Sequence, residues 1–256
     1  MAQWLRYEHQ GKPGFGTLEG EEVQPHEGDM FAAPKGAGSR IRLADVKLLP
    51  PCVPSKMPAL WNNFYERAAK EGQAIPEHPL YFLKGNNSFC AHGDVIRKPA
   101  GFTGKVVYEA ELGIVIGKTC TAVSEADALR YVFGYTCVND VTAVEYLRAD
   151  ASFVHWVRSK SFDTFCPFGP VITTGIDPAQ LRVKAVLESQ QRQDYPVSDM
   201  IFSPARLVSM ISHDMTLVPG DIIACGTSVG AGSMKPGNSI RVEIPGVGIL
   251  ENRYEG

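Results

Sequence analysis

Apolar residues along the chain recur mostly as the alternation or the short continuous runs that are typical of β-strands. The segments with this pattern are Val106–Lys118, Val132–Val138, Leu181–Pro196, Asp221–Thr227 and Ser239–Glu251. Helical patterns are few. A capping signature at Ser124 predicts one helix up to Tyr131, and Ser203-Pro204 predicts the start of a second. The pattern therefore predicts a mostly β protein of the α+β class with a few packed helices.

The N-terminal region differs from the rest by its shorter strand-like segments and frequent glycines. A stretch rich in Pro and Gly, Pro34-Lys35-Gly36-Ala37-Gly38, follows these segments, and the strand-like run Val46–Pro54 ends in prolines. Clusters of Gly and Pro mark turns and boundaries. We therefore expect a small N-terminal β-rich lobe over residues 1–50 and a main body over residues 51–256.

Length and composition narrow the class of protein. The 256 residues suffice for one large domain, or for one domain with a small appendage. A formal net charge of −3 gives no signal for polyanion binding, so we expect no nucleic-acid partner. The first residues lack a signal-peptide core, and no apolar run would span a bilayer, so we expect a cytoplasmic protein without membrane contact. The six cysteines form no Cys-x-x-Cys pair, which disfavours zinc and disulfides.

Two carboxylates, Glu109 and Glu111, interrupt the apolar segment Val106–Lys118. Alternate side chains of a strand share a face, so these two would stand about 6.5 Å apart along the chain. Like charges on a core strand repel each other unless a cation compensates them. Asp140 supplies a third carboxylate after the apolar segment Val132–Val138. Three oxygen ligands with room for water and substrate suit Mg²⁺ or Mn²⁺.

A simpler interpretation of the same residues needs no metal. Glu109 and Glu111 could line a solvated edge strand, and Asp140 could open a turn. The flanking Leu112 and Ile114, however, make the segment too apolar for an open edge, which favours carboxylates that face an interior cavity.

Four blocks that carry these groups are spaced through the main body. They are Tyr108–Leu112 with Val115–Lys118, Gly134–Thr136 continuing through Asn139–Ala143, Lys160–Pro170, and Pro219–Gly230. Together they resemble the fumarylacetoacetate hydrolase superfamily, from about residue 45 to the C-terminus. The N-terminal segment is similar to that family's variable N-terminal lobe only in general character.

The resemblance implies a fold, a cofactor and a type of chemistry. The fold would be a mixed β-sandwich roll that forms a homodimer, and Glu109, Glu111 and Asp140 would bind Mg²⁺ or Mn²⁺. In such a site, the metal chelates the 2-oxo and carboxylate oxygens of a small-molecule carboxylate substrate and stabilises its enolate.

Further site residues follow from the same resemblance. Lys160 would supply a positive charge to the enolate or the substrate carboxylate, and Thr227 with the backbone amides around Gly226 would bind a carboxylate. Lys84, in a Leu-Lys-Gly segment that resembles one near the family's active site, is a further candidate for substrate binding. The alternatives are a surface ammonium for Lys160, a tight turn at Gly226, and a solvated strand end for Lys84.

The segment Trp61–Glu71 departs from the family pattern. Hydrolytic members carry a His-x-x-Glu pair there, in which the imidazole activates water. In this chain Arg67 occupies the His position and Lys70 the Glu position, and a guanidinium stays protonated at neutral pH. His78 and His92 are the candidate substitutes for the missing base.

A second departure follows Asp140. Members of the family commonly continue with Ala-Arg-Asp, in which the Arg helps to hold the substrate, whereas this chain reads Ala-Val-Glu-Tyr from Ala143. Arg67, Arg148 and Arg158 are candidates to compensate, and the substrate is expected to differ from fumarylacetoacetate.

Three functions fit these observations. We expect C–C bond cleavage of a 2-oxo or β-diketo acid, by acylpyruvate-type hydrolysis or by decarboxylation. The alternative is isomerisation, a keto–enol or double-bond shift in a 2-hydroxydienoate or 2-oxo diacid, which needs no activated water. Loss of the His-x-x-Glu pair weighs against hydrolysis and leaves the other reactions less affected. A non-catalytic protein that binds small acids is least favoured, because an unused set of buried charges is costly.

Overall fold

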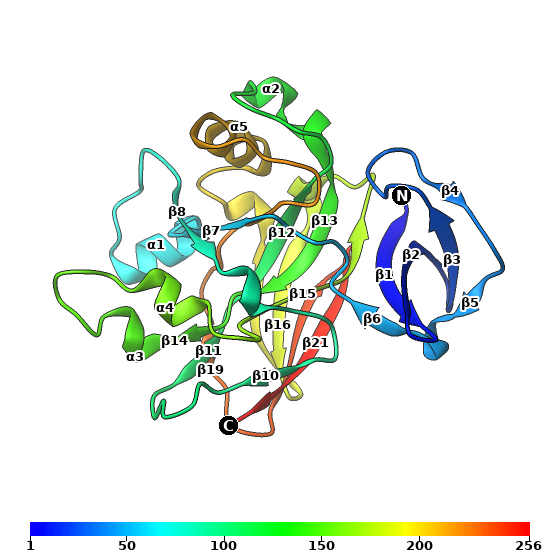
Figure 1. The fold of residues 1–256 in the computed structure, drawn as a ribbon. Helices are drawn as coiled ribbons and strands as arrows, with labels where there is room; N and C mark the ends of the chain where they lie inside the picture. Colours follow the sequence, from blue (N-terminus) through cyan, green and yellow to red (C-terminus); the bar gives the residue numbers. More distant parts are fainter.

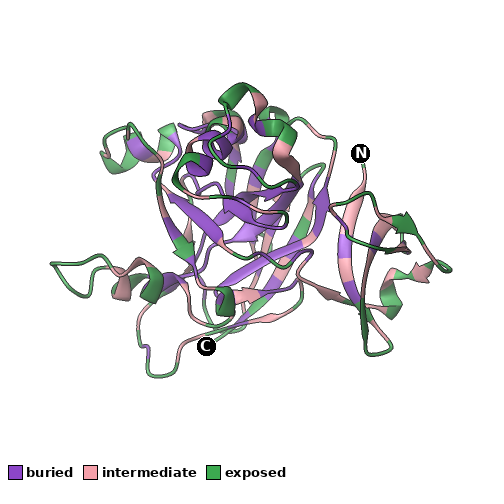
Figure 2. Ribbon diagram, turned by 45° about the horizontal axis from the view of Figure 1, so that its top comes forward, coloured by how far each residue is buried: buried purple, intermediate pink, exposed green.

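The computed structural model describes residues 1–256 and consists mainly of β-strands, with short helices at the top and at the left of Figure 1. The strands form three sheets, of thirteen, five and three strands. The prediction of a mostly β protein with a few helices is confirmed. Figure 2 shows that buried residues concentrate in the sheets of the main body, whereas many of the loops around it are exposed. No helix in the structure has the length and apolar character needed to cross a membrane.

The N-terminal strands form the region on the right of Figure 1. They are β1 (Gln3–His9), β2 (Lys12–Glu19), β3 (Glu22–Glu27), β4 (Lys35–Gly36), β5 (Ile41–Arg42) and β6 (Lys47–Leu49). Leu5, Tyr7 and Val23 pack with Val171 of the main body in a small core of their own. Because β1 also pairs with a strand of the main body, these strands continue the largest sheet rather than form a separate one.

The rest of the largest sheet carries the site. In spatial order after β1 come β15 (Cys166–Thr173), β13 (Val132–Asn139), β12 (Ala110–Ile116), β18 (Ile222–Ala224), β7 (Met57–Trp61) and β8 (Leu80–Lys84), while β9 (Phe89–Cys90) pairs with β15. All seven residues of β12 are buried. Burial on both faces accounts for its nearly continuous apolar run, since neither face needs polar side chains.

A second sheet packs against the first. Its five strands are β10 (Val95–Arg97), β21 (Gly248–Glu255), β20 (Ser239–Ile244), β16 (Arg182–Leu187) and β17 (Gln190–Pro196). Leu112 and Ile114 of β12 belong to one buried cluster with Val183 of β16 and Val242 of β20. The main body is therefore a two-layer arrangement whose core lies between the sheets.

The predicted strand over Val106–Lys118 is two strands. The third sheet contains β14 (Thr142–Ala143), β11 (Val106–Tyr108) and β19 (Gly232–Ser233), so β11 pairs with partners different from those of β12. Glu109 lies at the break, where its N–H donates to the Asn139 side-chain oxygen at 3.1 Å. The prediction that Glu109 and Glu111 are alternate residues of one strand was therefore wrong, because the chain changes sheets between them.

The helices are short and few. They are α1 (Tyr65–Glu71), α2 (Glu125–Ala128), α3 (Val144–Leu147), α4 (Trp156–Lys160) and α5 (Pro204–Asp214), with 3₁₀ turns at Leu43–Asp45, Asn86–Ser88, Leu129–Tyr131, Pro178–Gln180 and Val197–Asp199. The two predicted helices, α2 and α5, are present, capped by Ser124 and Ser203 respectively. The sequence pattern missed α1, α3 and α4. These three lie together on the left of Figure 1, beside the site described next.

Candidate active site

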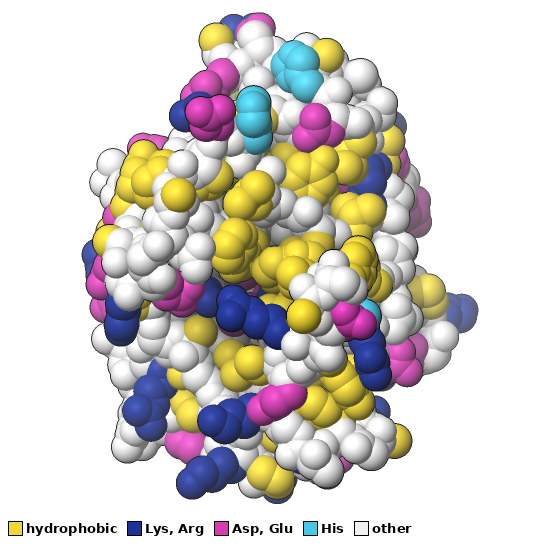
Figure 3. Space-filling model, turned by 90° about the vertical axis from the view of Figure 1, so that its left-hand side faces the viewer, with side chains coloured by type: hydrophobic (Ala, Val, Ile, Leu, Met, Phe, Trp, Pro, Cys, Tyr) yellow, Lys and Arg dark blue, Asp and Glu magenta, His cyan; other side chains and the backbone are white.

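A polar cavity of about 200 Å³ lies on the side of the main body that carries α1, α3 and α4. Five residues predicted from the sequence line it: Arg67, Glu109, Glu111, Lys160 and Thr227. Figure 3 views this side of the molecule, where hydrophobic side chains surround a hollow and positively charged side chains lie beside it. The tertiary structure thus brings together residues from four distant parts of the sequence.

Lys160 joins two of the carboxylates. It lies at the end of α4, is only 4% exposed, and donates through Nζ to Glu109 Oε2 at 2.5 Å and to Asp140 Oδ2. Burial lowers the pKa of Lys160, but Asp140 and Glu109 raise it more, so its pKa lies above the ordinary value. Lys160 is therefore a permanently charged ammonium inside the cavity and not a surface side chain.

Lys84 lies behind Asp140. It is buried on β8, and its Nζ donates to Asp140 Oδ1 at 2.7 Å, to the Phe165 carbonyl at 2.9 Å and to the Lys160 carbonyl. These three acceptors engage all the N–H groups of an ammonium. Lys84 does not line the cavity, so its placement supports a role in holding Asp140 and gives no support to the predicted direct binding of substrate.

Arg67 reaches into the cavity from α1 and binds Glu109. Its Nη1 donates to Glu109 Oε1 at 3.1 Å, and its Nε donates to Glu71 Oε1 at 2.9 Å. Thr142 Oγ1 donates to the other Glu109 oxygen at 3.2 Å. Burial alone would raise the pKa of Glu109, but Lys160 and Arg67 outweigh burial and lower it to about 2. Glu109 is therefore ionised and held by two cations.

Glu111 differs from its neighbours because no basic side chain lies within 4.0 Å of it. It is 1% exposed, and its carboxylate accepts one hydrogen bond, from the Gly226 N–H at 2.8 Å. Burial, followed by repulsion from Asp140 and Glu109, raises its pKa well above the ordinary value. A buried carboxyl with so little compensation either holds a proton or is balanced by an added cation.

The loop around Gly226 and Thr227 supports this site. Gly226 has a φ of +84°, a conformation that favours glycine, and the turn aims its N–H at Glu111. Thr227 Oγ1 donates to the Ala110 carbonyl at 2.7 Å and accepts from Gln193 Nε2 at 2.9 Å. The hydroxyl proton of Thr227 is thus already engaged, so the hydroxyl is available to a ligand only as an acceptor.

Neither candidate histidine lines the cavity. His78 lies in an exposed loop before Pro79. His92 Nδ1 accepts the Glu251 N–H of β21 at 3.1 Å, and burial lowers its pKa. The structure therefore supplies no histidine in place of the missing base, and it gives no support to the expectation that His78 or His92 compensates for Arg67.

The three candidate arginines have separate surroundings. Arg67 contacts the carboxylates, Arg148 lines a neighbouring apolar cavity, and Arg158 stacks over the Tyr146 ring at 4.2 Å. Only Arg67 is positioned to contact an anion in the polar cavity.

Sequence reasoning missed Asn62 and the aromatic residues. Asn62 lines the cavity, and its Oδ1 is buried without a hydrogen-bond partner, while its Nδ2 donates to the Ala74 carbonyl at 2.9 Å. Trp61, Phe82 and Trp156 also line the cavity. Trp61 and Asn62 belong to the segment Trp61–Glu71, which the sequence analysis singled out as a departure from the family pattern. The sequence did not indicate which residues of this segment would line the cavity.

The donor set fits a hard divalent cation in its chemistry. The carboxylates of Glu109 and Glu111 line the cavity and carry the kind of oxygen donor that Mg²⁺ and Mn²⁺ prefer, and Glu111 lacks a counter-cation. Asp140, the third predicted ligand, does not line the cavity, and its two oxygens accept from Lys84 and Lys160. No group of three or more His, Cys, Asp and Glu side chains gathers its donor atoms around one point, since the Lys160 ammonium lies between Glu109 and Asp140. Lys160 and a bound cation would therefore compete for these two carboxylates.

Comparison with known proteins bears on the family. Residues 56–255 match the family described as fumarylacetoacetate (FAA) hydrolase C-terminal, and residues 2–51 match the family described as Rv2993c-like, N-terminal. The oxaloacetate tautomerase YisK of Bacillus subtilis (strain 168) is 38% identical over 225 residues, which cover 82% of this chain and 74% of YisK.

Two solved structures add to the comparison. The crystal structure of 2-hydroxyhepta-2,4-diene-1,7-dioate isomerase from Mycobacterium marinum has a TM-score of 0.91 at 34% identity, covering 100% of this chain and 98% of that one. Maleylpyruvate hydrolase from Sphingobium sp. SYK-6, in complex with manganese(II) ion and pyruvate, has a TM-score of 0.80 at 28% identity, covering 100% of both chains. Isomerases and hydrolases thus share this fold. Because the family match extends over most of the main body and these relatives cover most of the chain, the protein belongs to the fumarylacetoacetate hydrolase superfamily.

Proposed function

We propose that the protein is a tautomerase or isomerase of a small 2-oxo acid and acts through an enolate. This reverses the order expected from the sequence, which placed C–C bond cleavage first. The observation that carries the proposal is the position of Arg67, which is ion-paired with Glu109 where hydrolytic members have a base that activates water.

The charged side chains that line the cavity are poorly suited to activate water. Arg67 and Lys160 remain protonated, and Glu109, with a pKa lowered to about 2, is a weak base. Glu111 is the fourth charged side chain that lines the cavity, and in this proposal its carboxylate binds the metal and is not free to act as a base. Hydrolysis requires an activated water, whereas tautomerisation requires that the enolate be stabilised and that protons move between C3 and the 2-oxygen.

Mg²⁺ or Mn²⁺, held by Glu109, Glu111 and Asp140, would polarise the 2-oxo carbonyl and favour loss of the C3 proton. Lys160 Nζ and the Arg67 guanidinium would attract the negative oxygens of the acid and of the enolate. Asn62 Oδ1, a buried acceptor without a partner, would accept the enol hydroxyl. A water molecule in the cavity would carry the proton between C3 and the 2-oxygen, since the charged side chains that line the cavity are protonated, weakly basic or assigned to the metal.

The proposal also assigns roles to the two regions of the chain, an oligomeric state and a class of substrate. Residues 51–256 would form the catalytic domain, residues 1–50 an accessory lobe, and two copies of the chain a homodimer. The substrate would be a small-molecule carboxylate.

The reaction can be tested with oxaloacetate. When the enol form of oxaloacetate is diluted into buffer, it converts to the keto form and its absorbance decays. Purified protein with Mn²⁺ should accelerate this decay while the mass of the acid stays constant. A protein-free sample with the same Mn²⁺ is the control, since the free ion itself promotes loss of CO₂. If the acid loses mass faster with the protein than in the protein-free control, and the enol absorbance decays no faster, the protein instead catalyses C–C cleavage.

Restoring the family's hydrolytic pair should restore water activation. We expect Arg67→His combined with Lys70→Glu to raise the hydrolysis of an acylpyruvate by about tenfold or more, since a positioned base contributes roughly 10²–10⁴-fold. The measurement is the loss of the diketo absorbance with identification of both products. Arg67→Gln combined with Lys70→Glu is the matched control, because it removes the same positive charges without adding a base. An equal gain in both double variants, or none in either, would contradict this explanation.

A further inference from the structure

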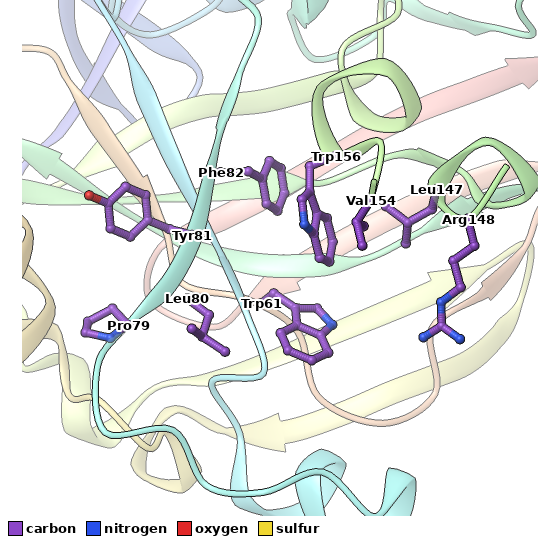
Figure 4. A pocket seen from close by; sticks show the side chains of 9 residues that line it. All are labelled: Trp61, Pro79, Leu80, Tyr81, Phe82, Leu147, Arg148, Val154 and Trp156. Atoms are coloured by element: carbon purple, nitrogen blue, oxygen red, sulfur yellow. The ribbon is translucent and has the colours of Figure 1, made fainter. Parts of the chain in front are cut away.

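A second and larger cavity adjoins the polar one. It measures about 530 Å³, against about 200 Å³ for the polar cavity. Trp61, Phe82, Leu147 and Trp156 line both, so the two cavities share a wall. Figure 4 shows the side chains around it, contributed by β7, β8 and the chain from α3 to α4. A ligand held at the carboxylates can therefore extend directly into this space.

Aromatic rings form the shared wall. Phe82 and Trp156 stack with their ring centroids 5.2 Å apart and their planes at 6°, and Trp61 lies 5.9 Å from Trp156 at 53°. Flat aromatic walls favour flat, unsaturated groups, because offset stacking and edge-to-face contacts add to the burial of apolar area. The shape of this wall thus indicates an aromatic or conjugated occupant.

The charge of the second cavity limits the occupant further. Seven of its nine lining residues are hydrophobic, and Arg148 is the only charged one. Arg148 forms no ion pair in the structure and lies at the end of the row in Figure 4 that is farthest from Tyr81. A cationic group is disfavoured here by repulsion from Arg148, and an apolar cavity of about 150 Å³ already suffices for a benzene ring.

We infer that this cavity, which we call the tail pocket, binds an aromatic tail of the substrate. The inference rests on the proposed function, because the 2-oxo acid end of the same molecule would occupy the polar cavity. The substrate class is then a 2-oxo acid whose C3 carries an aryl substituent. Oxaloacetate is turned over in the polar cavity alone and leaves the tail pocket unused.

Filling the tail pocket with a larger side chain should distinguish the contribution of the substrate's tail from that of its 2-oxo acid end. Val154 lines the tail pocket and not the polar cavity, whereas Val157, on α4, lines neither and is 59% exposed. We expect Val154→Trp to lower the ratio of kcat/KM for phenylpyruvate to kcat/KM for oxaloacetate by about tenfold, the range that small changes in an apolar pocket produce. Val157→Trp, the matched control, should leave this ratio unchanged.

A binding measurement keeps this test separate from the proposed function. Calorimetry on the Mn²⁺-loaded protein should show that 3-phenylpropanoate binds at least tenfold more tightly than propanoate, and that Val154→Trp removes the difference. If neither 2-oxo acid is turned over but this binding pattern holds, the tail pocket stands and the proposed function fails.

Two outcomes would overturn the tail pocket itself. One is turnover of oxaloacetate with no preference for phenylpyruvate and no tighter binding of 3-phenylpropanoate. The other is an unchanged substrate ratio in Val154→Trp together with a changed oligomeric state in size-exclusion chromatography. That result would make this apolar region a contact between copies of the chain.

Discussion

Replacing Lys160 with methionine is expected to lower the turnover of a 2-oxo acid by about 100- to 1,000-fold, the usual effect of losing one positioned donor to a developing oxyanion. Methionine keeps most of the length and apolar volume of the side chain but removes the ammonium. Glu109 and Asp140 would then face each other without the cation that now joins them. Without metal, the variant should therefore lose about 3–5 kcal/mol of its free energy of unfolding, as when one partner of a buried ion pair is removed.

The same variant should bind Mn²⁺ more tightly than the unmodified protein, because Lys160 no longer competes for Glu109 and Asp140. A rise in affinity together with a fall in turnover distinguishes a catalytic role of Lys160 from a purely structural one. Kinetics, denaturant unfolding and calorimetric titration with Mn²⁺ provide the three measurements.

Lys84→Met is the matched control for Lys160. It also removes a buried ammonium from Asp140, but Lys84 does not line the cavity. We expect a comparable loss of stability and a much smaller loss of turnover. Activity of folded Lys160→Met within fivefold of the unmodified protein would contradict the role assigned to Lys160.

Replacing Glu111 with glutamine is expected to weaken Mn²⁺ binding by about 100-fold or more, since changing even groups outside the metal's own ligand set costs roughly 10–100-fold. Glutamine keeps the length of the side chain and an oxygen that can accept the Gly226 N–H, but it removes the charge that lacks a partner. Treatment with EDTA should abolish activity in the unmodified protein, and Mn²⁺ should restore it. In the Glu111→Gln variant, the same addition should restore little.

Glu71→Gln serves as the control for a general loss of negative charge. The Glu71 side chain is 42% exposed and binds Arg67 outside the cavity. Direct titration with Mn²⁺ provides a result that does not depend on activity. Equal affinities in Glu111→Gln and the unmodified protein would show that Glu111 is no metal ligand.

Much of the site could be read from the sequence because its charged residues lie in apolar surroundings or in matched blocks. Glu109 and Glu111 were predicted as site residues because they are charged residues in an apolar segment. Lys160 and Thr227 were predicted because their segments resemble those of a known family. The structure brings all four to one cavity. Arg67 was found from its departure from the family pattern, although only the structure showed that it binds Glu109.

Other features could not be read in this way. Lys84 and Lys160 are both lysines in matched segments, yet one is directed behind Asp140 and the other into the cavity. Trp61, Phe82 and Trp156 come from different parts of the chain, and nothing in their local sequence indicates that their rings meet. Such facts depend on packing between segments that are distant in sequence.

The sequence by itself determined the mostly β class, the two capped helices and the family, and it singled out three carboxylates whose role as metal ligands stays a prediction. The class and the helices follow from local periodicity and capping chemistry, and the carboxylates from the rarity of charges in apolar runs, all of which act over a few residues. The family follows from the four matched blocks. The tertiary structure alone decided that Glu109 lies at a break between sheets, that Lys160 joins Glu109 to Asp140, and that an apolar cavity adjoins the polar one. The physical reason is that burial, ion pairing and cavity shape arise from contacts between distant segments, which local pattern does not specify.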